Sequence, residues 1–323
     1  MAIVTPGGDQ GFHERLIQAG VEAIPETEAT TRDVRPARVG LLNLMPRSAM
    51  ETTEVQWFQY MGEEVLQVEP VLVKFDDDWR ERDGASRQQI LRRYTPFSEV
   101  RERGLDGLIV TGDNLEIKQH IGFASRDPIP DDDIKYMRSL EQVLNWAREN
   151  VQSTIYSCLA GHLALRYFHG LPRQVGGEKT LGVFEHDVVD PSSPFTRGMN
   201  DTIHSPHSRW GFISPEEIAR VPDLGVLAIN DEVGWLLVEE ENEAGGRDLY
   251  VQGHPEYGRL DLHGEYMRDR EEDGKIPKHY YKDEEPGEEN VRQTWATDAR
   301  ALHANFVAML YEKFSRGSSA DQA

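Results

Sequence analysis

The stretch Ser153-Thr-Ile-Tyr-Ser-Cys-Leu-Ala-Gly-His-Leu-Ala-Leu-Arg-Tyr-Phe168 decides the fold class of this chain. Residues 154–158 predict a strand, and residues 159–168 predict a helix that begins at once. Gly170-Leu-Pro172 ends that helix, because glycine favours the turn after a helix and proline cannot continue one. A strand that turns directly into a helix is typical of α/β proteins with a parallel sheet.

The same alternation of strand and helix precedes this stretch. Short apolar runs predict strands at residues 38–44, 65–74 and 105–112. Helical spacing of apolar residues predicts helices at 52–61, 84–103 and 131–150. Pro70 indicates a break or an edge position in its strand, and Pro96 a break in its helix. Together with shorter strands over 180–260, the pattern favours an α/β fold with a doubly wound, mostly parallel sheet.

The chain length and its composition along the sequence favour one large domain. We expect residues 1–37 to form a weakly structured N-terminal arm with one short helix over 13–18. Residues 38–315 are predicted to form a single α/β domain that ends in an amphipathic C-terminal helix. Residues 316–323 are predicted to be a disordered tail, and the charged stretch 268–292 a solvated surface loop.

The chain is strongly acidic, with a formal net charge of −22 from 57 acidic and 35 basic residues. Such a surface repels nucleic acid and anionic membranes, so we expect neither as a partner. No apolar run approaches the roughly 18 residues of a membrane span, and the first residues lack the pattern of a secretion signal. Cys158 is the only cysteine, which excludes an internal disulfide and fits a cytoplasmic location.

Cys158 stands at the predicted junction of strand and helix. At this position a helix N-terminus lowers a thiol pKa and offers backbone N–H groups to a developing oxyanion. The small residues Ala160 and Gly161 allow the helix to pack close to the strand. Taken alone, a cysteine at a strand end is more often a small buried hydrophobe.

A second motif, Gly253-His254-Pro255-Glu256-Tyr257, follows the strand-like run at residues 248–252. Both His254 and Glu256 therefore lie in a turn that can face the same sheet edge as Cys158. A thiol needs a base to become a thiolate, and the imidazole needs a partner to hold its tautomer. A purely structural turn is the alternative, but the two motifs together predict a Cys–His–Glu triad.

Longer motifs span nearly the whole chain. They are VRPARVGLLNLMPRSAMETTEVQWFQYMG (34–62), GLDGLIVTGDNLE (104–116), QVLNWARENVQSTIYSC (142–158), EKTLGVFEH (178–186), SPHSRW (205–210) and GHPEYGRLDLHGEYMRD (253–269). These segments resemble the homoserine O-acyltransferase family of methionine biosynthesis, within the class I glutamine-amidotransferase-like (flavodoxin-like) superfamily. Residues 38–315 are then expected to be one acyltransferase domain.

The resemblance implies a role for each matching position. Cys158 matches the nucleophile that carries the acyl thioester, His254 the proton acceptor and Glu256 the third catalytic residue. The positions that line the substrate site in the family are matched by Lys179, Ser208 and Arg268. Without the resemblance, Lys179 and Arg268 would be solvated surface residues and Ser208 a turn residue.

Glu116 matches the position that is linked to the choice of acyl donor. Glutamate there implies acetyl-CoA and glycine succinyl-CoA, since a carboxylate would shrink the acyl pocket and repel succinate. Most of the family has TGAP where this chain has Thr111-Gly112-Asp113-Asn114, and C-W-x-x-Q-A where this chain has CLAGH. On the basis of Glu116 we favour acetyl-CoA, with succinyl-CoA as the alternative. We expect the backbone N–H groups at Leu159 and near Gly112 to form the oxyanion hole.

The resemblance implies ping-pong acylation of L-homoserine by acyl-CoA, the first committed step of methionine biosynthesis, in a homodimer. Acyl-CoA is then a co-substrate, and we expect no permanently bound cofactor. A serine-type acceptor, a glutaminase or cysteine hydrolase of the same fold, and a non-catalytic binding protein are the alternatives. We expect no metal at His204 and His207, which lack further ligands nearby, and a packed or network role for His162.

Overall fold

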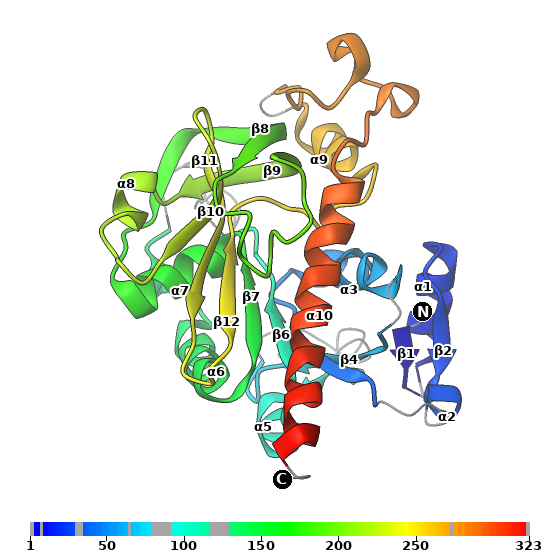
Figure 1. Cartoon of the computed structure of the whole chain (residues 1–323). Helices are drawn as coiled ribbons and strands as arrows, with labels where there is room; N and C mark the ends of the chain where they lie inside the picture. Colours follow the sequence, from blue (N-terminus) through cyan, green and yellow to red (C-terminus); the bar gives the residue numbers. More distant parts are fainter. Residues whose placement is uncertain are drawn as a thin grey trace.

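Strands that lie far apart in the sequence assemble into one 12-stranded sheet (Figure 1). The computed structural model describes residues 3–6, 9–29, 35–63, 66–78, 92–115, 129–271 and 274–320. The strands are β1 (Ile3–Thr5), β2 (Ala23–Pro25), β3 (Ala37–Leu42), β4 (Val68–Lys74), β5 (Thr95–Pro96), β6 (Gly107–Val110), β7 (Ser153–Ser157), β8 (Gln174–Val188), β9 (Thr202–Phe212), β10 (Gly225–Asn230), β11 (Gly234–Glu241) and β12 (Arg247–Val251).

The strand order is β2-β1-β4-β3-β6-β7-β12-β11-β10-β8-β9, with β5 beside β4. Pairings from β2 to β12 are parallel, whereas those from β12 to β9 are antiparallel. The parallel part holds the predicted strand–helix alternation. The antiparallel part is formed by residues 174–251, where we predicted shorter strands; β8 and β9 are longer than expected.

Helices cover both faces of the sheet. They are α1 (Gln10–Gln18), α2 (Glu26–Ala29), α3 (Arg47–Gln59), α5 (Phe97–Arg103), α6 (Met137–Asn150), α7 (Leu159–His169), α8 (Pro215–Ile218), α9 (Asp261–Asp269) and α10 (Ala296–Ala320). One apolar core joins the sheet to α5, α6 and α7, and another joins it to α1, α3 and α10. Two-sided burial explains why the parallel strands are nearly continuous in apolar residues and confirms the doubly wound fold.

A third, smaller core holds α9 and the residues before α10 against the end of α3. It contains Tyr60 after α3, Leu262 of α9, Trp295 before α10, and the buried Tyr280 and Tyr281. The two tyrosines belong to the stretch 268–292, which we expected to be a solvated loop. The surface of this loop is charged, but its two tyrosines anchor it in the core. The many charged residues around them hid this apolar contact from the sequence-based prediction.

The N-terminal residues differ most from the prediction. Instead of a weakly structured arm, β1 and β2 extend the parallel sheet beyond β4, and α1 packs on α3. The ion pairs from Arg15 and Arg93 to the fully buried Glu54 hold this part in place. Strands of three residues carry too little pattern to be recognised in the sequence.

The bounds of other elements also differ from the prediction. β4 continues through Pro70 and is not at an edge of the sheet. On the side of β4 that faces β1, the two strands pair only at Ile3↔Val68, so no backbone N–H is needed at Pro70. α10 reaches Ala320, into the predicted disordered tail, because extending a formed helix is easier than nucleating one. Residues 84–91 of the helix predicted over 84–103 lie outside the described residues. Of the rest, Thr95–Pro96 form β5 instead, and only α5 after Pro96 is helical.

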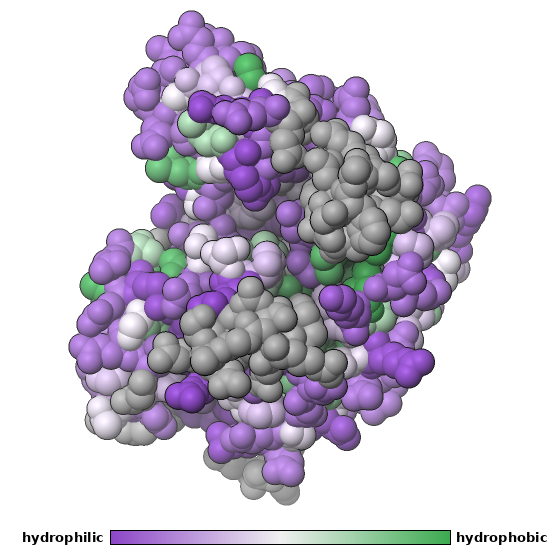
Figure 2. All heavy atoms as spheres, turned by 180° about the vertical axis from the view of Figure 1, so that it is seen from behind, coloured by the Kyte–Doolittle hydropathy of each residue, from purple (hydrophilic) through white to green (hydrophobic). Residues whose placement is uncertain are grey.

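The outer surface is mainly hydrophilic on the face seen in Figure 2, and hydrophobic residues appear there in small groups. Among the described residues, no helix has the length and apolar character needed to cross a bilayer.

Candidate active site

Three neighbouring strands end at one edge of the sheet. β7 lies between β6 and β12 and is parallel to both, so their carboxyl ends coincide. Gly112 follows β6, Cys158 follows β7, and His254 follows β12. The sheet order therefore brings together three residues that are separated by up to 142 positions in the sequence.

Cys158 forms a strained turn between β7 and α7. Its φ is 49° and its ψ is −115°, an unusual conformation for a residue other than glycine. Its backbone N–H donates to the carbonyl of Val251 at 2.7 Å, which fixes the turn against β12. A Cβ atom on Gly161 would lie 2.9 Å from the carbonyl oxygen of Tyr156, so glycine allows α7 to approach β7. The strand–turn–helix prediction is confirmed.

His254 and Glu256 lie beside this turn. The Nδ1–H of His254 donates to Oε1 of Glu256 at 2.8 Å, and His254 and Cys158 line the same cavity. The His254 backbone N–H donates to Pro206 at 2.7 Å, and its ring stacks on Tyr257 with centroids 4.4 Å apart. The imidazole is thereby held between a carboxylate and a thiol.

Two opposing effects act on the pKa of His254. Burial lowers it, but the negative charges of Glu256 and Cys158 and their hydrogen bonds outweigh the burial and raise it well above 6.5. The ring is therefore suited to exist as an imidazolium beside the Cys158 sulfur. This arrangement favours a reactive Cys158 nucleophile.

Gly112 is in direct contact with the nucleophile turn. A Cβ atom at this position would lie 3.1 Å from the Cβ of Cys158 and 3.7 Å from the backbone N of Leu159. The backbone at Gly112 and the N-terminus of α7 thus converge next to the thiol. These are the two backbone elements from which we predict an oxyanion hole.

A cavity of about 420 Å³ opens above these residues. Apart from Leu159, its lining includes the described residues that the sequence singled out for catalysis or substrate binding: Gly112, Cys158, Lys179, Ser208, His254, Glu256 and Arg268. Residues from β8, β9 and α9 thereby meet the ends of β6, β7 and β12. The structure brings the predicted set together but leaves the role of each residue a prediction.

Glu265 of α9 is the centre of the polar network in this cavity. Lys179 donates to its Oε2 at 3.0 Å, Ser208 donates to the same oxygen, and the Tyr257 hydroxyl donates to Oε1 at 2.6 Å. Burial raises the pKa of Glu265. Lys179 and the two hydroxyl donors lower it by more than burial raises it, so the pKa of Glu265 lies below its usual value. Glu265 is therefore an ionised carboxylate at the cavity wall.

Asp269 completes this network one helical turn further along α9. Lys179 also contacts its Oδ2 at 3.2 Å, and Arg268 contacts both carboxylate oxygens at 2.5 and 2.7 Å. Burial lowers the pKa of Lys179, but Glu265 and Asp269 outweigh it and raise that pKa. Lys179 is thus a buried cation and not a solvated lysine.

The sequence did not identify Tyr257, Asp261, Glu265 or Asp269 as site residues. The spacing of Asp261, Glu265 and Asp269 was the available signal, since residues four apart share one face of a helix. Asp261 accepts a hydrogen bond from Gln56 at 2.7 Å and also lines the cavity.

Other residues that the sequence analysis discussed lie outside this network. Glu116 lies outside the described residues. His162 is fully buried and hydrogen-bonds Gln252 at 3.1 Å, which confirms the packed, network role. His207 contacts His186 at 3.2 Å, whereas His204 approaches Glu185 and Asp298, so His204 and His207 have separate partners.

The comparisons with known proteins identify the family of this chain. A model of the homoserine O-succinyltransferase family matches residues 9–316. A homoserine O-acetyltransferase of Ruegeria pomeroyi is 34% identical over 302 residues, which cover 93% of this chain and 91% of the relative. The chain belongs to this family. A homoserine O-succinyltransferase of Pseudoalteromonas atlantica is 36% identical over 281 residues, covering 86% of this chain and 85% of that one.

As a member of the homoserine O-succinyltransferase family, the chain is an acyltransferase. Its relatives bear both acetyl- and succinyltransferase names, so membership does not decide the donor. The fold prediction is confirmed by a solved glutamine amidotransferase of Thermotoga maritima, with a TM-score of 0.50 and 10% identity over 86% of this chain and 98% of that one. At this identity the likeness concerns the fold alone.

Proposed function

We propose that this chain transfers an acyl group from acyl-CoA to the hydroxyl of L-homoserine, as the first committed step of methionine biosynthesis. The observation that carries the proposal is the buried His254 ring, held between Glu256 and Cys158 at the floor of the cavity. A nucleophile, a base and an orienting carboxylate in this order are suited to acyl transfer through a covalent intermediate.

In the first half-reaction, the Cys158 thiolate attacks the thioester carbon of acyl-CoA. The negative charge that develops on the carbonyl oxygen is stabilised by the backbone N–H groups of Leu159 and Gly112. The bond to the CoA sulfur breaks, His254 gives its proton to the departing thiolate, and the acyl group stays on Cys158 as a thioester.

In the second half-reaction, homoserine enters after CoA has left. Neutral His254 takes the proton from the homoserine hydroxyl, whose oxygen attacks the acyl carbon and releases the Cys158 thiolate. We assign Arg268, Lys179 and Ser208 to binding of the amino-acid part of the acceptor. A guanidinium matches the two oxygens of an α-carboxylate, and all three side chains line the cavity.

We favour acetyl-CoA as the donor, with succinyl-CoA as the alternative. Glu116 is one basis for this choice, and it is tested by the Glu116→Gly variant. An unchanged ratio of acetyl to succinyl transfer in this variant would remove that basis. We further propose a cytoplasmic homodimer without a permanently bound cofactor, to be checked by sedimentation equilibrium and by the absorbance spectrum of the purified protein.

Mass spectrometry of Cys158 tests the reaction directly. The protein is incubated with acetyl-CoA or succinyl-CoA without an acceptor, and then homoserine or serine is added. We expect an adduct on Cys158 that homoserine removes, and no adduct in Cys158→Ser under the same conditions. No adduct with either donor would overturn the proposal, removal by serine alone would change the acceptor, and ammonia release from glutamine would favour a glutaminase.

A further inference from the structure

The ring of Tyr257 lies nearly flat against the ring of His254. Their centroids are 4.4 Å apart and their planes differ by 21°. Both side chains line the cavity that also contains Cys158. The Nδ1 edge of the imidazole faces Glu256, so Tyr257 covers one face of a ring that is already held at its edge. A stacked contact of this kind restricts the rotation of the imidazole, whose outer torsion is otherwise only weakly restrained.

Tyr257 is itself anchored at both ends. Its hydroxyl donates to Oε1 of Glu265 on α9 at 2.6 Å. Its carbonyl accepts from the Tyr60 hydroxyl at 3.1 Å and from the Trp295 indole N–H at 2.7 Å. Tyr60 follows α3 and Trp295 precedes α10, so three separate elements fix the position of Tyr257. A ring held in this way is a rigid surface against which the imidazole of His254 can be positioned.

The stacked contact also affects the charge of the imidazole. The face of a tyrosine ring is electron-rich and attracts a cation that lies within about 6 Å of its centroid. Because the Tyr257 hydroxyl donates to an ionised carboxylate, more electron density stays on the ring and this attraction becomes stronger. Burial raises the pKa of Glu265, whereas Lys179, the two hydroxyl donors and the charge of His254 lower it. The charge of the base and the polar network around Glu265 therefore stabilise each other.

We propose that Tyr257 is a positioning residue that holds the His254 ring in its reactive orientation, favours the charged form of that ring and couples it to Glu265. The inference rests on the proposed acyl transfer and adds to it a residue that acts through the base. The stacked ring serves the first half-reaction, in which the imidazolium accompanies attack by the Cys158 thiolate. The hydroxyl serves the second, because it holds Glu265 in the network that we assign to acceptor binding. Loss of the whole ring and loss of the hydroxyl alone therefore have different consequences.

Tyr257→Leu tests the stacked ring. The titration of His254 is followed by NMR of the protein labelled with [15N]histidine, in the Cys158→Ser background, where no thiol titrates. We expect the midpoint of the His254 titration to fall by about one pH unit, because a cation loses its aromatic partner, whereas Tyr257→Phe should stay within about half a unit. Tyr167→Leu, an exposed tyrosine outside the cavity, is the matched control and should leave the midpoint unchanged. An unchanged midpoint in a folded Tyr257→Leu protein would overturn the inference.

Tyr257→Phe tests the hydroxyl, and it decides the inference if Tyr257→Leu does not fold. We expect transfer from acylated Cys158 to homoserine to slow by about tenfold, as for the loss of a hydrogen bond to a charged group, and acylation by acyl-CoA to slow by less than about threefold. Quenched-flow mass spectrometry of Cys158 measures the two half-reactions separately. Equal slowing of both, or slowing of neither, would overturn the inference. The absence of any adduct in the unmodified protein would instead overturn the proposed function, and the His254 titration would still test Tyr257.

Discussion

The Nδ1 atom of His254 lies 2.8 Å from Oε1 of Glu256, and both side chains are buried. Pro255 stands between them in the sequence, so one short turn supplies both the ring and the group that orients it. Because the carboxylate faces Nδ1, the other ring nitrogen is left for Cys158. The pKa of the ring is thus raised by a carboxylate only two positions away in the sequence.

Glu256→Gln should separate the orientation of the ring from its charge. The amide oxygen can still accept from Nδ1, but without the negative charge the pKa of His254 falls, and less thiolate forms. We expect acylation of Cys158 to slow by on the order of 10²- to 10⁴-fold. Alkylation of Cys158 by iodoacetamide between pH 6 and 8 should slow in parallel; an unchanged pH profile would contradict this role.

Gly112→Ala should impair the reaction more than the fold. Its Cβ would lie 3.1 Å from the Cβ of Cys158, so a small shift of the loop moves the Gly112 N–H from the oxyanion. We expect acylation to fall by about 10²-fold, as for the loss of one oxyanion donor. Acylation rates and urea unfolding of the same sample provide the measurement.

Gly161→Ala is the matched comparison. Its Cβ would meet the Tyr156 carbonyl at 2.9 Å, between α7 and β7. We expect this variant to lose roughly 1 to 3 kcal/mol of unfolding free energy, because a packed backbone must move. The Gly112 prediction would be wrong if both variants lost stability equally.

Arg268→Ala should weaken acceptor binding and leave the first half-reaction intact. The side chain is half exposed, so its removal affects folding little, but it is one of the two cations of fixed charge among the described lining residues. We expect the KM for homoserine to rise by about 10- to 100-fold, with Cys158 acylated at the normal rate. Arg270→Ala, exposed at the C-cap of α9 and outside the cavity, should leave both quantities unchanged.

Asp248 gives stability a dependence on pH far from the site. Burial raises its pKa to about 7, against hydrogen bonds from Asn242 and the Thr154 N–H that lower it. The folded protein therefore holds this proton more tightly than the unfolded chain, where the pKa is 3.8. The resulting stabilisation is fully present below the unfolded pKa and is lost as the pH rises through about 7.

Asp248→Asn should remove this dependence. An amide keeps the acceptor for Asn242 and Thr154, both at 2.9 Å, and carries no charge at any pH. Relative to the variant, we expect the unmodified protein to lose roughly 3 kcal/mol between pH 5 and 8. Urea unfolding at both pH values tests this; parallel curves for the two proteins would refute it, and Asp223→Asn controls for net charge.

The sequence predicted those parts of the site that depend on local pattern. The strand, turn and helix around Cys158 follow from residues 153–172, and His254 and Glu256 are only two positions apart. Their convergence follows from the rule that parallel strands end at one edge. The elements β6, β7 and β12 obey this rule although nearly a hundred residues separate the last two.

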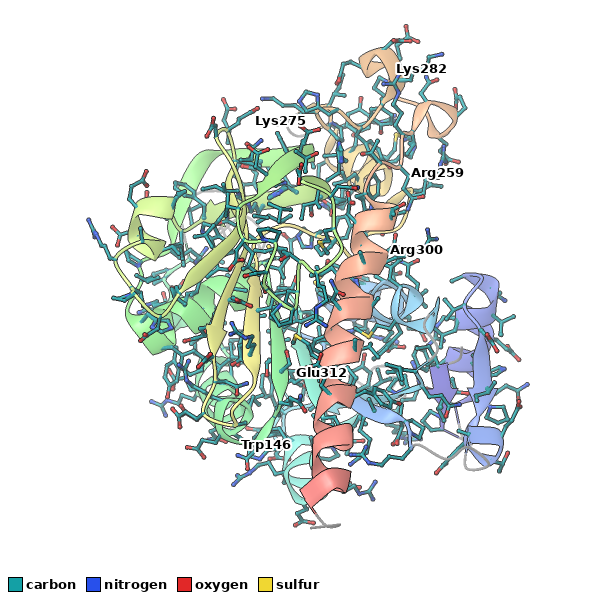
Figure 3. All side chains as sticks on the ribbon, viewed as in Figure 1. Trp146, Arg259, Lys275, Lys282, Arg300 and Glu312 are labelled. Carbon is teal, nitrogen blue, oxygen red and sulfur yellow. The ribbon has the colours of Figure 1, made fainter. Side chains whose placement is uncertain are left out.

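The contacts that escaped prediction are made between distant elements. Glu265 is one acidic residue among many in a chain of net charge −22, and only the fold reveals that Lys179 and Ser208 meet it. Tyr280 and Tyr281 were hidden within a charged stretch for the same reason. In Figure 3, Lys275 lies beside the end of the β8–β9 hairpin, where it donates to the Lys179 carbonyl at 2.5 Å and links this loop to the site.

The short strands at the N-terminal side of the sheet also affect how the protein behaves in a crowded solution. An open strand edge invites pairing with other chains, and β1 covers part of the β4 edge (Figure 1). The outermost strand, β2, has only three residues and ends in Pro25, which cannot donate to a further strand. The segment that looked least structured in the sequence thus guards this side of the enzyme against intermolecular strand addition and aggregation.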